Sequence, residues 1–132
     1  MNWISSKLSF AHFCPNPILP YHTLVFPKSG KHKLSELTDE ELSDFFNLVQ
    51  RVQRTLESQL QTDSSTIYIN DGDTHHLPAL HCHVLPRREH DLEESDGIYE
   101  LLENFSTLPK LLDEDEKRMV EELNLLHEEI QG

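Results

Sequence analysis

In its most informative segment the chain reads Ala79-Leu80-His81-Cys82-His83-Val84-Leu85-Pro86-Arg87. The segment is mostly apolar and is bounded by prolines at 78 and 86, a pattern typical of a buried strand. Side chains alternate faces along a strand, so His81 and His83 point to one side and Cys82 to the other, toward the core. Two imidazoles on one apolar face are costly to desolvate, and Arg87 adds a fixed positive charge. The pattern predicts chemistry on an anionic substrate, with Arg87 as a phosphate contact.

Two other interpretations of this strand remain open. Buried histidines are usually just hydrogen-bonded core residues. A His-x-His strand also presents two ligands to a metal, and a third could come from His75, His76 or His90. We rank catalysis or phosphate binding first, a metal site second and inert core residues third.

The segment resembles the signature of the histidine triad superfamily, and most closely its fragile-histidine-triad branch, the dinucleoside polyphosphate hydrolases. That branch typically ends this strand in Pro-Arg. The resemblance covers nearly the whole chain, with motifs in the family's order. The similar segments outside the strand are Leu8-Ser9-Phe10-Ala11, Pro17 to Pro27, Asn70-Asp71-Gly72 and Ile98-Tyr99-Glu100-Leu101.

The chain departs from the family's pattern at four places. Ala79 stands where the first histidine of the triad is expected, and Thr74-His75 replaces a Gly-Gln pair. Tyr21 replaces the glycine of a Pro-Gly-His turn, and Cys14 stands in place of an asparagine that contacts the ribose. These departures lie near the expected nucleotide pocket, so they bear on substrate and activity rather than on the fold.

The resemblance implies that His81 attacks the α-phosphorus, giving a covalent nucleotidyl-histidine that water hydrolyses. A neutral imidazole attacks through one nitrogen when the other holds its proton, and the main-chain carbonyl of Ala79 can hold that proton. His83 could then donate to a phosphate oxygen. We therefore expect impaired or altered catalysis rather than none.

The expected substrate contacts lie around these two histidines. Structural roles remain open for some of them: Asn70 could stabilise its turn, His22 could be structural, and His75 and His76 could be exposed loop residues. The residues assigned to substrate binding are His22, Asn70, Thr74, His75, His76, Leu77 and Arg87.

Two function classes follow from these residues. The first is a hydrolase that cleaves diadenosine tri- or tetraphosphate or a related nucleotide conjugate. The second is a binding module that holds a nucleotide or a partner without turning it over. Neither requires a tightly bound cofactor or a protein-held metal, although a divalent ion such as Mg²⁺ could accompany the nucleotide.

The periodicity of the chain predicts an α+β fold with an antiparallel sheet, a long helix and a C-terminal helix, in one domain over residues 1–132. Thr38 and Glu41 form a capping-box pattern that opens the long helix. The apolar stripe of this helix consists of Leu42, Phe45, Phe46, Val49, Val52, Leu56 and Leu60. The family resemblance implies a homodimer with this helix near the two-fold axis, and the width of the stripe fits a second contact surface. The alternative that stays open is a monomer whose core buries the whole stripe. The expected elements are strands over 9–14, 22–26 and 66–70, the strand of His81, and helices over 38–61, from Ser95 or Asp96 to Leu102, and from Asp113 to Ile130.

Composition limits the partners and the compartment. The net charge of −13 argues against general nucleic-acid binding, and no apolar run is long enough to span a bilayer. Residues 1–6 lack the pattern of a signal peptide. Cys14 and Cys82 are too few for a disulfide framework, so we expect a cytoplasmic location, with the nucleus as a second compartment.

Overall fold

A computed structural model describes residues 2–69, 71, 79–103 and 121 of the chain. It confirms an α+β architecture in which five strands form one sheet. The elements are β1 (Asn2–Ser5), β2 (Ser9–Phe13), β3 (Thr23–Pro27), the 3₁₀ turn η1 (Leu34–Glu36), α1 (Asp39–Leu60), β4 (Ser64–Ile69), β5 (Cys82–Arg87) and α2 (Gly97–Glu103).

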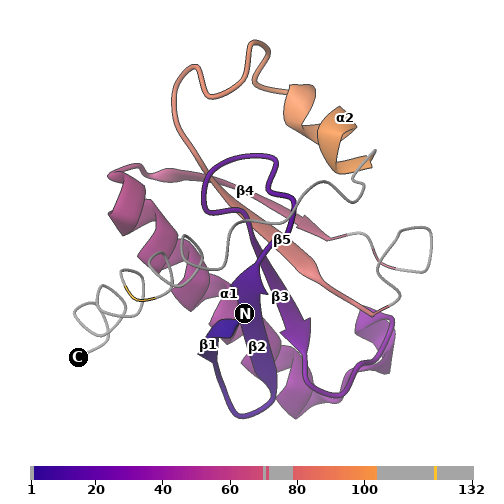
Figure 1. Cartoon of the computed structure of the whole chain (residues 1–132). Helices are drawn as coiled ribbons and strands as arrows, with labels where there is room; N and C mark the ends of the chain where they lie inside the picture. The colour runs from indigo at the N-terminus through magenta and orange to yellow at the C-terminus, as the bar shows by residue number, and fades with distance from the viewer. Residues whose placement is uncertain (1, 70, 72–78, 104–120, 122–132) are drawn as a thin grey trace.

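The strands are ordered β1-β2-β3-β5-β4, and every neighbouring pair is antiparallel. Leu24 of β3 and Tyr68 of β4 lie opposite His83, one on each side of β5. Residues that face one another across strands share a sheet face, so these side chains surround His83. The sheet therefore has a histidine-bearing face, and α1 crosses behind the strands in Figure 1.

The main core lies between α1 and the other face of the sheet. Phe45, Val52 and Leu56 of α1 are fully buried against Cys82 and Val84 of β5. The expectation that Cys82 faces the core is confirmed. The predicted stripe on α1 is only partly buried, because Leu42 and Phe46 are 37% and 41% exposed. Leu48, which the stripe omitted, is buried instead.

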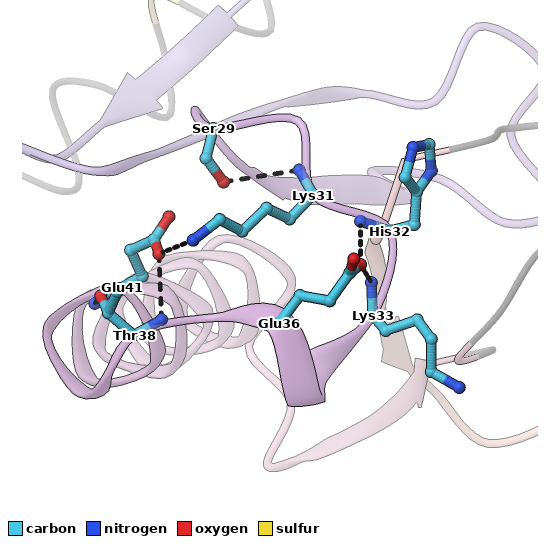
Figure 2. A network of polar contacts seen from close by, with 7 residues as sticks. All are labelled: Ser29, Lys31, His32, Lys33, Glu36, Thr38 and Glu41. Carbon is cyan, nitrogen blue, oxygen red and sulfur yellow. Dashed lines mark hydrogen bonds and ion pairs between the residues drawn. The ribbon is translucent and has the colours of Figure 1, made fainter.

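The segment from Ser29 to Glu41 is held by a polar network, shown in Figure 2. The predicted capping box is present: the Glu41 backbone N–H donates to Thr38 Oγ1 over 3.1 Å, and the Thr38 N–H donates to Glu41 Oε1 over 2.9 Å. Lys31 Nζ donates to the same carboxylate over 2.6 Å, which lowers the pKa of Glu41 to about 2. This segment also contacts the approach to β5, since the Leu80 N–H donates to the Lys31 carbonyl over 2.9 Å.

Some element boundaries differ from the expectation. β5 begins at Cys82 rather than at residue 79, because the Leu80 N–H bonds to the Lys31 carbonyl instead of a neighbouring strand. β4 begins two residues early, at Ser64. The sequence did not predict β1 or η1, which are too short to show a period. The helix expected from Asp113 lies outside the described residues, apart from Glu121. None of the helices in the described ranges has the length and apolar character needed to cross a bilayer.

Candidate active site

Three imidazoles from separate parts of the chain meet on the histidine-bearing face. His83 lies in β5, His81 directly precedes that strand, and His22 directly precedes β3. The ring centroids of His81 and His83 are 5.0 Å apart in an edge-on arrangement, and those of His22 and His83 are 5.1 Å apart. All three residues are at most 4% exposed. The structure thus places His22 beside the two residues predicted to act.

A hydrogen-bond chain fixes the protons on two of these rings. The backbone N–H of Ile18 donates to His22 Nδ1 over 3.2 Å, so the proton of neutral His22 is on Nε2. His22 Nε2 lies 2.8 Å from His83 Nδ1 and donates to it. Neutral His83 then carries its own proton on Nε2, where it can be donated to a phosphate oxygen.

His81 has the opposite tautomer. Its Nδ1 lies 2.9 Å from the carbonyl oxygen of Ala79, which can only accept, so Nδ1 carries the proton. The lone pair is then on Nε2, the nitrogen that a nucleophile requires. The hydrogen bond expected from the sequence is present even though the side chain at 79 is a methyl group. The arrangement therefore pairs one basic nitrogen with one donor.

Burial keeps His22 neutral. Desolvation, followed by repulsion from a charged His81, lowers the pKa of His22 to about 3. A neutral His22 can donate from Nε2 while accepting at Nδ1, whereas a charged one could not accept the Ile18 N–H. The low pKa thus preserves the hydrogen-bond chain at neutral pH.

Aromatic side chains line the site around the histidines. Tyr68 meets His83 edge-on at 5.8 Å, and Phe26 contacts His81 at 5.7 Å between ring centroids. Phe10, His12 and Phe26 stack nearly parallel, with centroids 5.2–6.1 Å apart. We had not singled out Phe26 or Tyr68 from the sequence, although strand alternation in β3 and β4 places both on this face.

Two of the departures from the family pattern lie beside the site. Tyr21 has a φ of 67°, a left-handed conformation that glycine adopts without strain, and its carbonyl accepts the Thr23 hydroxyl at 2.9 Å. The Tyr21 hydroxyl accepts from Gln59 of α1 over 3.1 Å. Cys14 is fully buried, and this burial raises the pKa of its thiol to about 12. Cys14 is therefore a buried, uncharged side chain at neutral pH.

The guanidinium of Arg87 is held by contacts within the protein. Its guanidinium makes a bidentate ion pair with Asp91 at 2.7 and 2.9 Å, and it donates to Thr66 Oγ1 and the Ser95 carbonyl. Four of its five N–H groups are thus used within the protein. The ion pair raises the pKa of Arg87 and lowers that of Asp91. Arg87 thus links β5 to β4 and to the segment before α2, and its predicted phosphate contact stays a prediction.

The other expected site residues cannot be placed. Asn70, Thr74, His75, His76 and Leu77 lie outside the described residues, so their predicted substrate contacts stay predictions. Among the described residues, no group of three or more His, Cys, Asp or Glu side chains is arranged to hold a metal ion.

Known proteins that resemble this chain share its histidine-bearing domain. The sequence profile of the HIT domain, the histidine triad domain, matches residues 3–90, which include all three imidazoles. The chain belongs to the HIT family.

Curated relatives in the family carry hydrolase names. A bis(5'-adenosyl)-triphosphatase of Dictyostelium discoideum is 34% identical over 96% of this chain and 85% of its own length. The asymmetrical bis(5'-nucleosyl)-tetraphosphatase of Schizosaccharomyces pombe is 39% identical over 74% of this chain. The match spans only 55% of that relative, little more than half of its length.

Solved structures share the fold. The NitFhit protein of Caenorhabditis elegans superposes with a TM-score of 0.76 and 28% identity, over 95% of this chain and 27% of that one. The diadenosine triphosphate hydrolase of Plasmodium falciparum gives a TM-score of 0.71 at 23% identity, over 98% of this chain and 76% of that one. The second likeness concerns the fold alone.

Proposed function

We propose that this chain is a nucleotidyl hydrolase that cleaves dinucleoside polyphosphates, of the diadenosine tri- or tetraphosphate type, or a related nucleotide conjugate. The observation that carries the proposal is the pair of opposite tautomers on His81 and His83. One ring presents a basic Nε2 and its neighbour an Nε2 proton, at a ring separation of 5.0 Å. The named activities of the relatives support the same substrate class.

In the first step His81 Nε2 forms a bond to the α-phosphorus, and the bond from that phosphorus to the bridging oxygen breaks. Diadenosine triphosphate would thus give a nucleotidyl-His81 and release ADP. His83 Nε2–H donates to a phosphate oxygen, where negative charge develops. In the second step water attacks the same phosphorus, which frees His81 and releases AMP. No tightly bound cofactor is needed, and Mg²⁺ would arrive with the polyphosphate.

The aromatic row beside His81 supports a nucleotide rather than a simple phosphate ester. Phe10, His12 and Phe26 form a partly covered aromatic surface on the same sheet face. Such surfaces stack with nucleobases, and each stacked base contributes about 1–3 kcal/mol of binding.

The second candidate is a nucleotide- or partner-binding module with little turnover. The alanine at 79 and the commitment of Arg87 to Asp91 favour this candidate, since each removes a group that could act on substrate. Incubation with diadenosine triphosphate, followed by chromatography for AMP and ADP, separates the two functions. We expect both products from the wild-type protein, and at least about 10³-fold slower formation of them by His81→Ala. Binding of the dinucleotide without products would support the module.

We also propose a homodimer formed through α1 and β4. Leu42 and Phe46 on α1 and Ile67 on β4 are 37–41% exposed, so they offer apolar surface to a second copy of the chain. β4 is an edge strand of the described sheet, and an uncovered edge can pair with another chain. A cytoplasmic or nuclear site of action is likewise proposed for a protein whose two cysteines are free and buried.

A further inference from the structure

The ring of Phe26 lies against the imidazole of His81. Their centroids are 5.7 Å apart and their planes are tilted by 31°. Phe26 is 9% exposed and His81 is 4% exposed, so neither ring has much room to move. His83 contacts His81 as well, but edge-on. The His81 ring is thus packed against two other rings while its Nδ1 bonds to the Ala79 carbonyl.

The methyl group of Ala79 belongs to the same packing cluster. Ala79 packs against the buried cluster of Cys14, Leu24 and Phe26. Ala79 lies two residues before His81, just ahead of β5. A larger side chain at 79 would extend from the methyl group that packs against this cluster, whose largest member is the ring of Phe26. Protein interiors are close-packed, so the small residue at 79 and the large one at 26 are compatible with each other.

We infer that Phe26 is a positioning residue for His81 and takes over the steric support that a side chain larger than Ala79 would give. The terminal torsion of histidine is a broad, roughly two-fold rotor, so a hydrogen bond alone holds the ring loosely. A half-turn would exchange the positions of Nδ1 and Cδ2, and those of Nε2 and Cε1, so Nδ1 would lose the Ala79 carbonyl and its proton would no longer be fixed there. Packing by Phe26 resists that turn and keeps the lone pair on Nε2. The inference rests on the proposed function only in taking His81 as the nucleophile.

The tautomer of His81 can be measured without substrate. We would label the imidazoles with ¹⁵N and record the His81 ring nitrogens in the wild-type protein, in Phe26→Val and in Phe45→Val. Phe45 is a fully buried ring of α1 in the core cluster on the other face of the sheet, so it controls for general loss of packing. In the wild type we expect a protonated Nδ1. In Phe26→Val the two nitrogen shifts should move toward each other, as the tautomers mix, whereas Phe45→Val should keep the wild-type shifts.

The outcomes separate this inference from the proposed function. Unchanged His81 shifts in folded Phe26→Val, or equal changes in both variants, would overturn the role of Phe26. A wild-type His81 protonated on Nε2 would instead count against the proposed mechanism. If Phe26→Val does not fold, Phe26→Leu keeps more of the volume and serves for the same comparison.

A double-mutant cycle tests the shared space directly. In the wild-type background, Ala79→His should lower the urea midpoint. In the Phe26→Val background the same substitution should lower the midpoint clearly less, or not at all, because the shorter side chain at position 26 leaves room for the imidazole. An equal drop in both backgrounds would show that residues 26 and 79 are independent, and would overturn the packing argument. This readout requires no enzymatic activity.

Discussion

At the residue scale, the buried imidazole of His22 makes stability depend on pH. Its pKa is about 3 in the folded protein and 6.5 when exposed, so the unfolded chain binds the proton more tightly. The contribution of His22 to stability is fully present above pH 6.5 and is lost as the pH falls toward 3.

We predict that His22→Gln flattens the pH dependence of the unfolding free energy between pH 6.5 and 4.5. The wild type should lose up to about 1.4 kcal/mol per pH unit more than the variant in this window. Glu41, whose pKa is also lowered, begins to contribute near the lower end of this window, but both proteins carry it, so its effect cancels in the comparison. Urea titrations at several pH values would measure both slopes, and equal slopes would contradict a neutral, buried His22.

Tyr21 holds a left-handed backbone conformation next to His22. We predict that Tyr21→Gly is more stable than Tyr21→Ala by about 1 kcal/mol, because a Cβ at positive φ is strained. Both variants lose the ring and the hydrogen bond with Gln59, so only the backbone preference separates them. Denaturant unfolding of the pair provides the measurement. A more stable alanine variant would show that residue 21 leaves this conformation when the ring is removed.

Strand alternation made part of the site predictable at this scale. The spacing of His81 and His83 put both rings on one face, and the carbonyl at 79 was expected to hold the His81 proton. The partner of His83 was harder to predict, because His22 is 61 residues away in sequence and its approach depends on how β3 pairs with β5. The ion pair of Arg87 with Asp91 was not predicted, because Asp91 lies in an irregular turn, where no period shows which side chains meet.

At the element scale, Arg87 joins β5 to β4 and to the segment that leads into α2. Removing one partner of a buried ion pair leaves the other charge uncompensated. We therefore predict that Arg87→Gln lowers the free energy of unfolding by about 3 kcal/mol and leaves the KM for dinucleotide unchanged in the fraction that is folded. Arg88→Gln, at the exposed neighbouring position, is the matched control and should cost less than about 0.5 kcal/mol.

Urea unfolding and steady-state kinetics on the two arginine variants would distinguish the roles. A large rise in KM for Arg87→Gln with little loss of stability would instead indicate that Arg87 contacts a phosphate of the substrate.

The long helix shows what periodicity can and cannot predict about an element. Its start at Thr38 followed from the capping box, because that signal is local and chemical. The buried side of α1 was predicted less well. The apolar stripe included Leu42 and Phe46, yet both side chains are more than a third exposed, because apolar spacing alone does not tell which side of a helix meets the sheet. β1 was not predicted because it exists through its pairing with β2.

At the scale of the whole molecule, the exposed apolar side chains of α1 and β4 predict a dimer. Sedimentation equilibrium at micromolar concentration should give about twice the monomer mass of 15.4 kDa. Phe46→Asp should shift the equilibrium toward monomer, because it places a charge in the proposed contact. Asn47→Asp adds the same charge at a neighbouring exposed position and should have a smaller effect. A wild-type protein that sediments at 15.4 kDa would refute the dimer.

The proposed reaction depends on covalent catalysis by His81. The most direct measurement is to mix the protein with diadenosine triphosphate, quench rapidly at alkaline pH to preserve an acid-labile phosphorus–nitrogen bond, and map any adduct by mass spectrometry. We predict an adenylyl group on His81 in the wild type, and in His81→Ala no adduct and hydrolysis at least about 10³-fold slower. Undiminished hydrolysis by His81→Ala, or an adenylyl group on another residue, would contradict the account.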